Sequence, residues 1–172
     1  MHDAPSSAQV WDQIGTMQAL VSVGYRVRAL NLPGRGDTTI FQKDGNNRGL
    51  WLQEVMDDFS LYPFILVMAS TGSGYGVPFI NSLIEENLQH AMVGMVAIGP
   101  SLMPPLLKIS PIPSLLMYGD RDPLFLRDAE RIQPIEHVTV IPIAKAGHQC
   151  WIDRPEAFNL ALVDWILNVN NE

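Results

Sequence analysis

The chain has 172 residues, of which 47% are hydrophobic and 17% charged, so it is long enough to fold as one globular domain with a sizeable core. Its formal net charge of −7 repels phosphate backbones and anionic lipids, which makes nucleic acid and membrane surfaces poor partners. Cys150 is the only cysteine, which excludes an intrachain disulfide and a cysteine-rich zinc site and favours the cytoplasm as the location.

Nothing in the sequence predicts export or membrane anchoring. No apolar run approaches the roughly 18 residues that a membrane span needs. Residues 1–7 have neither the basic region nor the apolar core of a signal peptide.

The first predicted element is an amphipathic helix over residues 7–23. Apolar side chains recur there at helical spacing, and Gly24 follows as a stop signal. The short alternating segment Tyr25–Leu30 then predicts a strand, which leads into a Gly-rich turn at residues 31–37.

From residue 48 onward, helical and strand patterns alternate. We predict helices over residues 48–60, 77–86, 124–132 and 155–168, and strands over residues 63–69, 91–98, 114–118 and 137–143. This order implies right-handed crossovers and a mostly parallel sheet with helices on both faces, with ligands bound at the carboxyl ends of the strands. The Pro-rich segment 101–110 is too short for a separate lid, so we expect no substantial cap domain.

Ser70 is the candidate nucleophile because it stands between the predicted central strand and a Gly-rich turn into a helix. A nucleophile elbow needs small residues two positions before and after the serine, since its strained turn brings backbone atoms close together. Gly72 meets this requirement, whereas Met68 departs from it. Two alternatives stay open: Ser70 caps the next helix, or Ser73 is the nucleophile, although Tyr75 fits its elbow poorly.

The glycines of Gly72–Gly76 allow a further interpretation as a dinucleotide-binding loop. Their Gly-x-Gly-x-Gly spacing differs from the usual Gly-x-Gly-x-x-Gly, and no acidic residue ends the strand predicted at 91–98. We therefore favour the elbow. An unrelated α/β enzyme stays a further alternative.

Asp122 and His148 complete the candidate site, because each follows a predicted strand and the order nucleophile, acid, base is one in which a Ser-His-Asp triad occurs. Asp122 would hold His148 in the right tautomer, and His148 would act as base and then acid in acyl transfer through an acyl-serine. The alternatives are a turn or cap role for Asp120 and Asp122 and a structural role for the histidine. We interpret Cys150 as packing beneath this loop.

Five segments suggest a family: Leu32–Gly36, Ala69–Ser70, Tyr75 with Pro78–Phe79, Tyr118–Pro123 and Ala146–Glu156. With them the whole chain resembles the α/β-hydrolase superfamily, and within it the small CIB-like (abhydrolase-domain 14) group. The resemblance implies hydrolysis of small acyl esters, and removal of acyl groups from lysine amines with coenzyme A as acceptor. We expect a small acyl substrate, no metal and no bound cofactor other than coenzyme A as that acceptor; no protein partner is indicated.

The resemblance also places an oxyanion loop at His2-Asp3-Ala4, where the family has His-Gly. The oxyanion hole would then use the backbone N–H groups of Thr71 and Ala4. In the family a strand precedes this loop and lies between those predicted at 25–30 and 63–69, so we expect residues 1–172 to form a single domain that is incomplete at its N-terminus, with a gap in the sheet. We expect Ala4 to fray, and Asp3 to oppose an oxyanion. A catalytically impaired binding protein is the alternative function.

Overall fold

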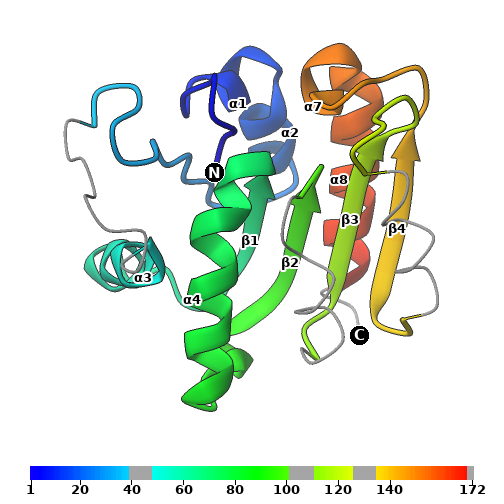
Figure 1. Ribbon diagram of the computed structural model, residues 1–172. Helices are drawn as coiled ribbons and strands as arrows, with labels where there is room; N and C mark the ends of the chain where they lie inside the picture. Colours follow the sequence, from blue (N-terminus) through cyan, green and yellow to red (C-terminus); the bar gives the residue numbers. More distant parts are fainter. Residues whose placement is uncertain (39–47, 101–110, 126–134, 170–172) are drawn as a thin grey trace.

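The computed structural model describes residues 1–38, 48–100, 111–125 and 135–169, and Figure 1 shows their arrangement around one sheet. The sheet has four strands in the order β1-β2-β3-β4, and every neighbouring pair is parallel. The strands are β1 (Phe64–Ala69), β2 (Met92–Ile98), β3 (Ser114–Gly119) and β4 (Val138–Ile143). All four strands predicted from residue 63 onward are therefore present.

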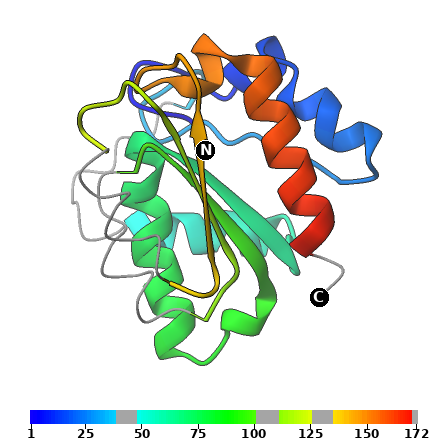
Figure 2. The same ribbon diagram turned by 90° about the vertical axis from the view of Figure 1, so that its right-hand side faces the viewer.

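Helices cover both faces of this sheet, as Figures 1 and 2 show. One layer consists of α3 (Arg48–Asp58) and α4 (Ser73–Glu85); the other consists of α1 (Val10–Gln13), α2 (Thr16–Ser22), α7 (Cys150–Asp153) and α8 (Pro155–Val169). Short 3₁₀ helices lie at η2 (Ser70–Gly72) and η3 (Gln89–Ala91). Each layer forms its own hydrophobic core against one face of the sheet. The predicted α/β architecture is confirmed.

Burial varies across the sheet. Every residue of β3 is buried and all but one of β2 are, whereas the four middle residues of β4 are half-buried or exposed. Strands in the middle of a parallel sheet are covered on both faces, which explains their unbroken apolar sequences. Of the other expectations, the segment 101–110 and most of the helix predicted at 124–132 lie outside the described residues.

The predicted helix over residues 7–23 is wrong in one respect, because it is two short helices. α1 ends at Gln13 and α2 begins at Thr16, with Gly15 between them at φ 76°. A right-handed helix cannot continue through this left-handed conformation, which glycine adopts without steric cost. The turn allows both short helices to pack on the face that α8 also covers.

The predicted strand Tyr25–Leu30 is also wrong. The segment alternates between half-buried and exposed residues, as a strand would, but it does not form a strand. A groove of about 440 Å³ separates it from β1 and is lined mainly by these residues, by 63–67 and by apolar side chains of α2. The alternating pattern was present, but strand formation also needs a hydrogen-bonding neighbour.

Met1 lies beside β1 in the position of a strand residue. Its amine donates to the carbonyl of Val67 at 2.6 Å, and the N–H of Ala69 donates to its carbonyl at 3.1 Å. This is the hydrogen-bond pattern of a parallel pair opposite Met68. By the alternation of a strand, the N–H groups of Ile65 and Val67 face the same side and border the groove. Burial lowers the pKa of the Met1 amine from 8.0 to about 5.

No helix in the described ranges combines the length and the apolar character that crossing a membrane requires.

Candidate active site

Ser70 lies at a sharp turn between β1 and α4. β1 ends at Ala69, η2 begins at Ser70, and the backbone of Ser70 has φ 44°. A left-handed serine between a parallel strand and a helix is the strained geometry of a nucleophile elbow. The Ser73 hydroxyl donates to the Ser70 carbonyl at 2.6 Å and is buried, so it stabilises the turn and is not presented to solvent.

Met68, the large residue at the position where the elbow needs a small one, is accommodated by a glycine on the facing helix. Its side chain is fully buried, and a Cβ atom at Gly76 would lie only 2.0 Å from its sulfur. Because Gly76 has no side chain, α4 can pack over Met68 without opening the turn. The sequence alone did not pair these two residues, since they lie eight positions apart on different elements.

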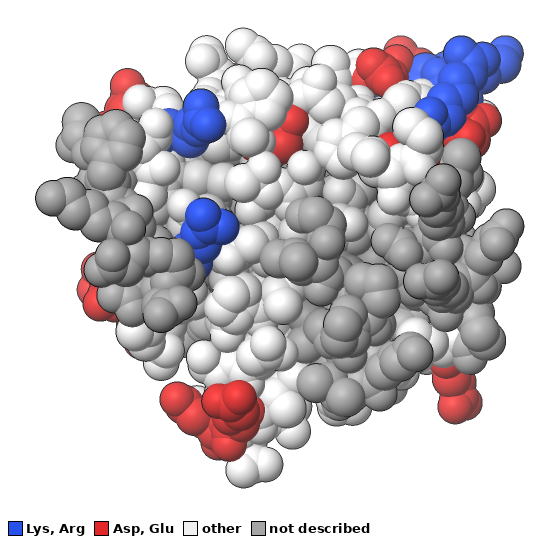
Figure 3. Space-filling view, in the orientation of Figure 1, with Lys and Arg blue, Asp and Glu red and all other residues white. Residues whose placement is uncertain are grey.

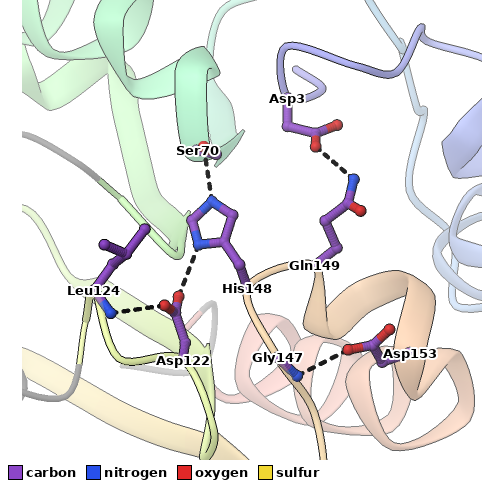
Figure 4. A network of polar contacts seen from close by, with 8 residues as sticks. All are labelled: Asp3, Ser70, Asp122, Leu124, Gly147, His148, Gln149 and Asp153. Carbon is purple, nitrogen blue, oxygen red and sulfur yellow. Dashed lines mark hydrogen bonds and ion pairs between the residues drawn. The ribbon is translucent and has the colours of Figure 1, made fainter.

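The structure brings the three predicted site residues into one hydrogen-bonded chain at the carboxyl end of the sheet (Figure 4). His148 Nδ1 lies 2.7 Å from Asp122 Oδ2, and His148 Nε2 lies 3.0 Å from Ser70 Oγ. Since a carboxylate only accepts, Nδ1–H donates to Asp122 and leaves Nε2 to accept the serine O–H. Asp122 is fully buried, whereas the His148 side chain is 35% exposed. A substrate can thus approach the histidine and serine but not the aspartate.

The backbone around Asp122 orients its carboxylate. Its second oxygen, Oδ1, accepts the N–H of Leu124 at 2.9 Å, so both oxygens have fixed partners. Asp120 is exposed and accepts the N–H of Ala146 at 3.3 Å, which ties the end of β3 to the histidine loop. The structure thus gives the two aspartates different partners: Asp122 bonds to His148, and Asp120 bonds to the backbone of Ala146.

Two glycines, whose roles the sequence analysis missed, allow the histidine loop to lie against the strand ends. A Cβ atom at Gly99 would lie 3.0 Å from the His148 ring, and one at Gly119 would lie 2.1 Å from the carbonyl oxygen of Gly147. Each of these glycines stands at the end of a predicted strand, and this position was the signal in the sequence that could have identified them. The N–H of Gly147 is in turn capped by Asp153 at 2.8 Å.

The N-terminal loop lies against the elbow and is tied down. A Cβ atom at Gly72 would lie 3.2 Å from the His2 carbonyl oxygen. The His2 ring is buried and bridges two backbone groups, donating to the Asp3 carbonyl at 2.6 Å and accepting the N–H of Leu32 at 3.0 Å. Burial lowers the pKa of His2, which favours the neutral ring that this bridge needs. The premise that only a free terminus holds this loop is therefore wrong, and fraying of Ala4 stays a prediction.

The two predicted oxyanion donors are Thr71 and Ala4. Neither backbone N–H has a hydrogen-bond acceptor within the described ranges, and both residues are half-buried. Asp3, between His2 and Ala4, is buried, and its Oδ2 accepts a hydrogen bond from Gln149 at 2.7 Å. Gln149 was not identified from the sequence, because its partner is 146 positions away.

The dinucleotide-loop interpretation of Gly72–Gly76 is wrong. Gly72 lies in η2, while Gly74 and Gly76 lie inside α4, so no open loop is present to hold a pyrophosphate. In the described part of the chain, no group of three or more His, Cys, Asp or Glu side chains is arranged to hold a metal ion. In Figure 3 the Lys and Arg side chains on the visible face lie in separate places, and those at the upper right lie beside Asp and Glu side chains.

We expect Cys150 to be unreactive although it lies two residues from His148. The thiol is fully buried, and burial raises its pKa to about 12. Because the thiolate is the reactive species, iodoacetamide at pH 8 should leave the folded protein unlabelled and should label it after denaturation. Mass spectrometry measures this directly; fast labelling of the folded chain would contradict the burial.

Comparison with known proteins gives relatives along nearly the whole chain. It is 30% identical to "Protein ABHD14A" of Rattus norvegicus over 96% of this chain and 69% of that protein. It is 26% identical to the human "Putative protein-lysine deacylase ABHD14B" over 96% of this chain and 80% of that protein. No family model matches.

Solved structures show the same fold. A CIB-like hydrolase from Thermoplasma acidophilum superposes with a TM-score of 0.85 at 20% identity, covering 98% of this chain and 84% of its own. A thermophilic esterase from Thermogutta terrifontis superposes with a TM-score of 0.81 at 13% identity, covering 98% and 88%. The sequence relatives and these structures agree: this chain belongs to the abhydrolase-domain 14 group of the α/β-hydrolase superfamily.

Proposed function

We propose that this protein is a serine hydrolase or acyltransferase that acts on small acyl esters or acyl-amines through an acyl-serine intermediate. The observation that carries the proposal is the hydrogen-bonded chain from Asp122 through His148 to Ser70. A serine hydroxyl is a weak nucleophile unless a base takes its proton, and this chain supplies the base and its orienting carboxylate.

In the first half of the reaction, Ser70 Oγ attacks the acyl carbon while His148 Nε2 takes the hydroxyl proton. Asp122 stabilises the resulting imidazolium, and the N–H groups of Thr71 and Ala4 donate to the oxyanion. When the tetrahedral intermediate collapses, the bond to the leaving group breaks and His148 returns the proton to that alcohol or amine. The acyl group is then an ester of Ser70.

In the second half, an acceptor attacks the acyl-serine. His148 takes the proton of water or of a thiol, the ester bond to Ser70 breaks, and the serine regains its proton. Water gives a carboxylic acid, and a thiol gives a thioester. Coenzyme A is our proposed thiol acceptor and acyl-lysine a proposed amine substrate, in line with the deacylase name of the human relative. We propose the cytoplasm as the location.

A catalytically impaired binding protein is the second candidate function. The observation that favours it is the buried carboxylate of Asp3 in the loop beside the elbow, because a negative charge there opposes a developing oxyanion. Under this alternative the chain would bind an acyl compound without turning it over.

The two candidates differ in their reaction with a fluorophosphonate probe, which phosphonylates an activated serine with loss of fluoride. We expect stoichiometric labelling on the peptide that contains Ser70, detected by mass spectrometry, together with turnover of p-nitrophenyl acetate. Heat-denatured protein is the control for non-specific labelling. A folded chain that neither reacts with the probe nor hydrolyses the ester would reject the enzymatic function.

A further inference from the structure

One side-chain hydrogen bond joins the two loops on either side of Ser70. Asp3 Oδ2 accepts from Gln149 Nε2 at 2.7 Å, and Figure 4 shows this bond running between the N-terminal loop and the loop that carries His148. Asp3 is 2% exposed. The bond thus links the neighbour of Ala4 to the neighbour of His148.

The Gln149 end of this bond is held firmly by the backbone. The Gln149 carbonyl accepts the N–H groups of Ile152 at 2.8 Å and Asp153 at 3.0 Å, which begins α7. Its neighbour His148 is held by Asp122, as described above. The side chain of Gln149 therefore extends from a fixed point toward Asp3.

The Asp3 end is held by the loop itself. Its carbonyl accepts from the His2 ring at 2.6 Å and from the N–H of Ser6 at 3.3 Å. Its other carboxylate oxygen, Oδ1, is buried without a hydrogen-bond partner. A buried carboxylate with an unpaired oxygen costs stability, so general stabilisation does not account for an aspartate here.

We propose that Asp3 and Gln149 form a latch that positions the backbone N–H of Ala4 relative to Ser70 and His148. This inference rests on the proposed function, in which Ala4 is an oxyanion donor. Both latch residues are positioning residues. Misplacing a reacting group by about 1 Å can cost a hundredfold in rate, and losing one oxyanion donor costs about a hundred- to a thousandfold.

The test compares Asp3→Ala, Gln149→Ala and the double variant in ester hydrolysis. We expect each single variant to lower kcat by about ten- to a hundredfold with KM within about twofold, because the oxyanion forms only in the transition state. The double variant should be no slower than the slower single one. Asp3→Asn keeps an oxygen that can accept from Gln149 and should retain most of the wild-type kcat.

Gln18→Ala is the matched control, because Gln18 also donates to an aspartate, Asp12, but on the exposed surface. It should leave kcat unchanged. Unchanged kcat in Gln149→Ala, an effect confined to KM, or a multiplicative loss in the double variant would overturn the latch. An Asp3→Asn variant as slow as Asp3→Ala would overturn it too, because the charge and not the hydrogen bond would then be responsible.

Hydrogen exchange tests the latch without activity. In Gln149→Ala the amides of the buried residues His2 and Asp3 and the hydrogen-bonded amide of Ser6 should exchange at least tenfold faster than in the wild type, while those of β2 and β3 stay unchanged. Unchanged exchange of these N-terminal amides would overturn the latch even in an inactive protein. Wild-type protein without Ser70-dependent turnover would instead reject the proposed function, so the two failures are distinguishable.

Discussion

Replacing Ser70 with alanine is expected to abolish hydrolysis of a small acyl ester while leaving the fold intact. Loss of a serine nucleophile typically costs several orders of magnitude in kcat, because the acyl-enzyme route is no longer available. Ser70 follows the carboxyl end of β1, and within the described residues its hydroxyl bonds to His148 alone. Activity, probe labelling and circular dichroism of the purified variant measure the chemistry and the fold separately.

Ser73→Ala is the matched control for this experiment. Its hydroxyl donates to the Ser70 carbonyl and is buried, so its removal should destabilise the chain by about 1 kcal/mol while most activity remains. Equal loss of activity in the two variants would show that the nucleophile has been assigned wrongly. If the Ser70→Ala variant keeps its activity, the acyl-serine mechanism at Ser70 is rejected.

A chain extended at Met1 by four strand-forming residues, such as Val-Ile-Val-Ile, should melt several degrees higher than the 172-residue chain. Met1 already pairs with β1 in parallel register, so added residues would continue along the edge into the groove of about 440 Å³. Each buried β-branched side chain contributes roughly 1.5–3 kcal/mol, against about 1–2 kcal/mol of backbone entropy per ordered residue. A net gain of a few kcal/mol raises Tm by about 2–4 °C per kcal/mol.

An extension of Gly-Ser-Gly-Ser is the control of equal length, and it should not raise Tm. In the Val-Ile extension, residues 25–30 should also become protected from hydrogen exchange, since the new strand gives them a neighbour. A melting temperature equal for both extensions would show that the groove does not accept a strand. Hydrogen bonds of His2 and Asp3 already hold the N-terminal loop. We therefore expect the Val-Ile extension to raise stability clearly and to change turnover less.

The pH dependence of stability should also differ between the 172-residue chain and an extended chain. The Met1 amine has a pKa of about 5 in the folded chain against 8.0 unfolded, so between these values only the unfolded chain binds the proton. This lowers the free energy of unfolding as the pH falls from 8 to 5, by about 4 kcal/mol in all. Extension replaces the Met1 amine with a peptide N–H, so the decrease in the free energy of unfolding between pH 8 and pH 5 should disappear. Urea titrations of both chains at pH 5 and pH 8 measure this free energy.

Local patterns in the sequence were enough to predict the parallel sheet and the three residues that meet at its carboxyl end. Unbroken apolar runs such as Phe64–Ala69 are local signals of buried strands, and alternation with helices leaves few topologies. The expected central position of this strand is wrong for the described sheet, because β1 lies at its edge and three of its six residues are half-buried. Because parallel strands end at one edge, residues that follow different strands are brought together without any knowledge of side-chain packing. Ser70, Asp122 and His148 were found for this reason.

Features that depend on a partner distant in the chain became visible in the folded structure and not before. Tyr25–Leu30 has the alternating pattern of a strand but does not join the sheet that the structure describes, and Met68 fits its elbow only because Gly76 faces it. The bond between Asp3 and Gln149 likewise joins residues from opposite ends of the chain. Hydrogen-bond pairing, close packing and loop contacts are satisfied in three dimensions, so a local pattern of residue types cannot specify them.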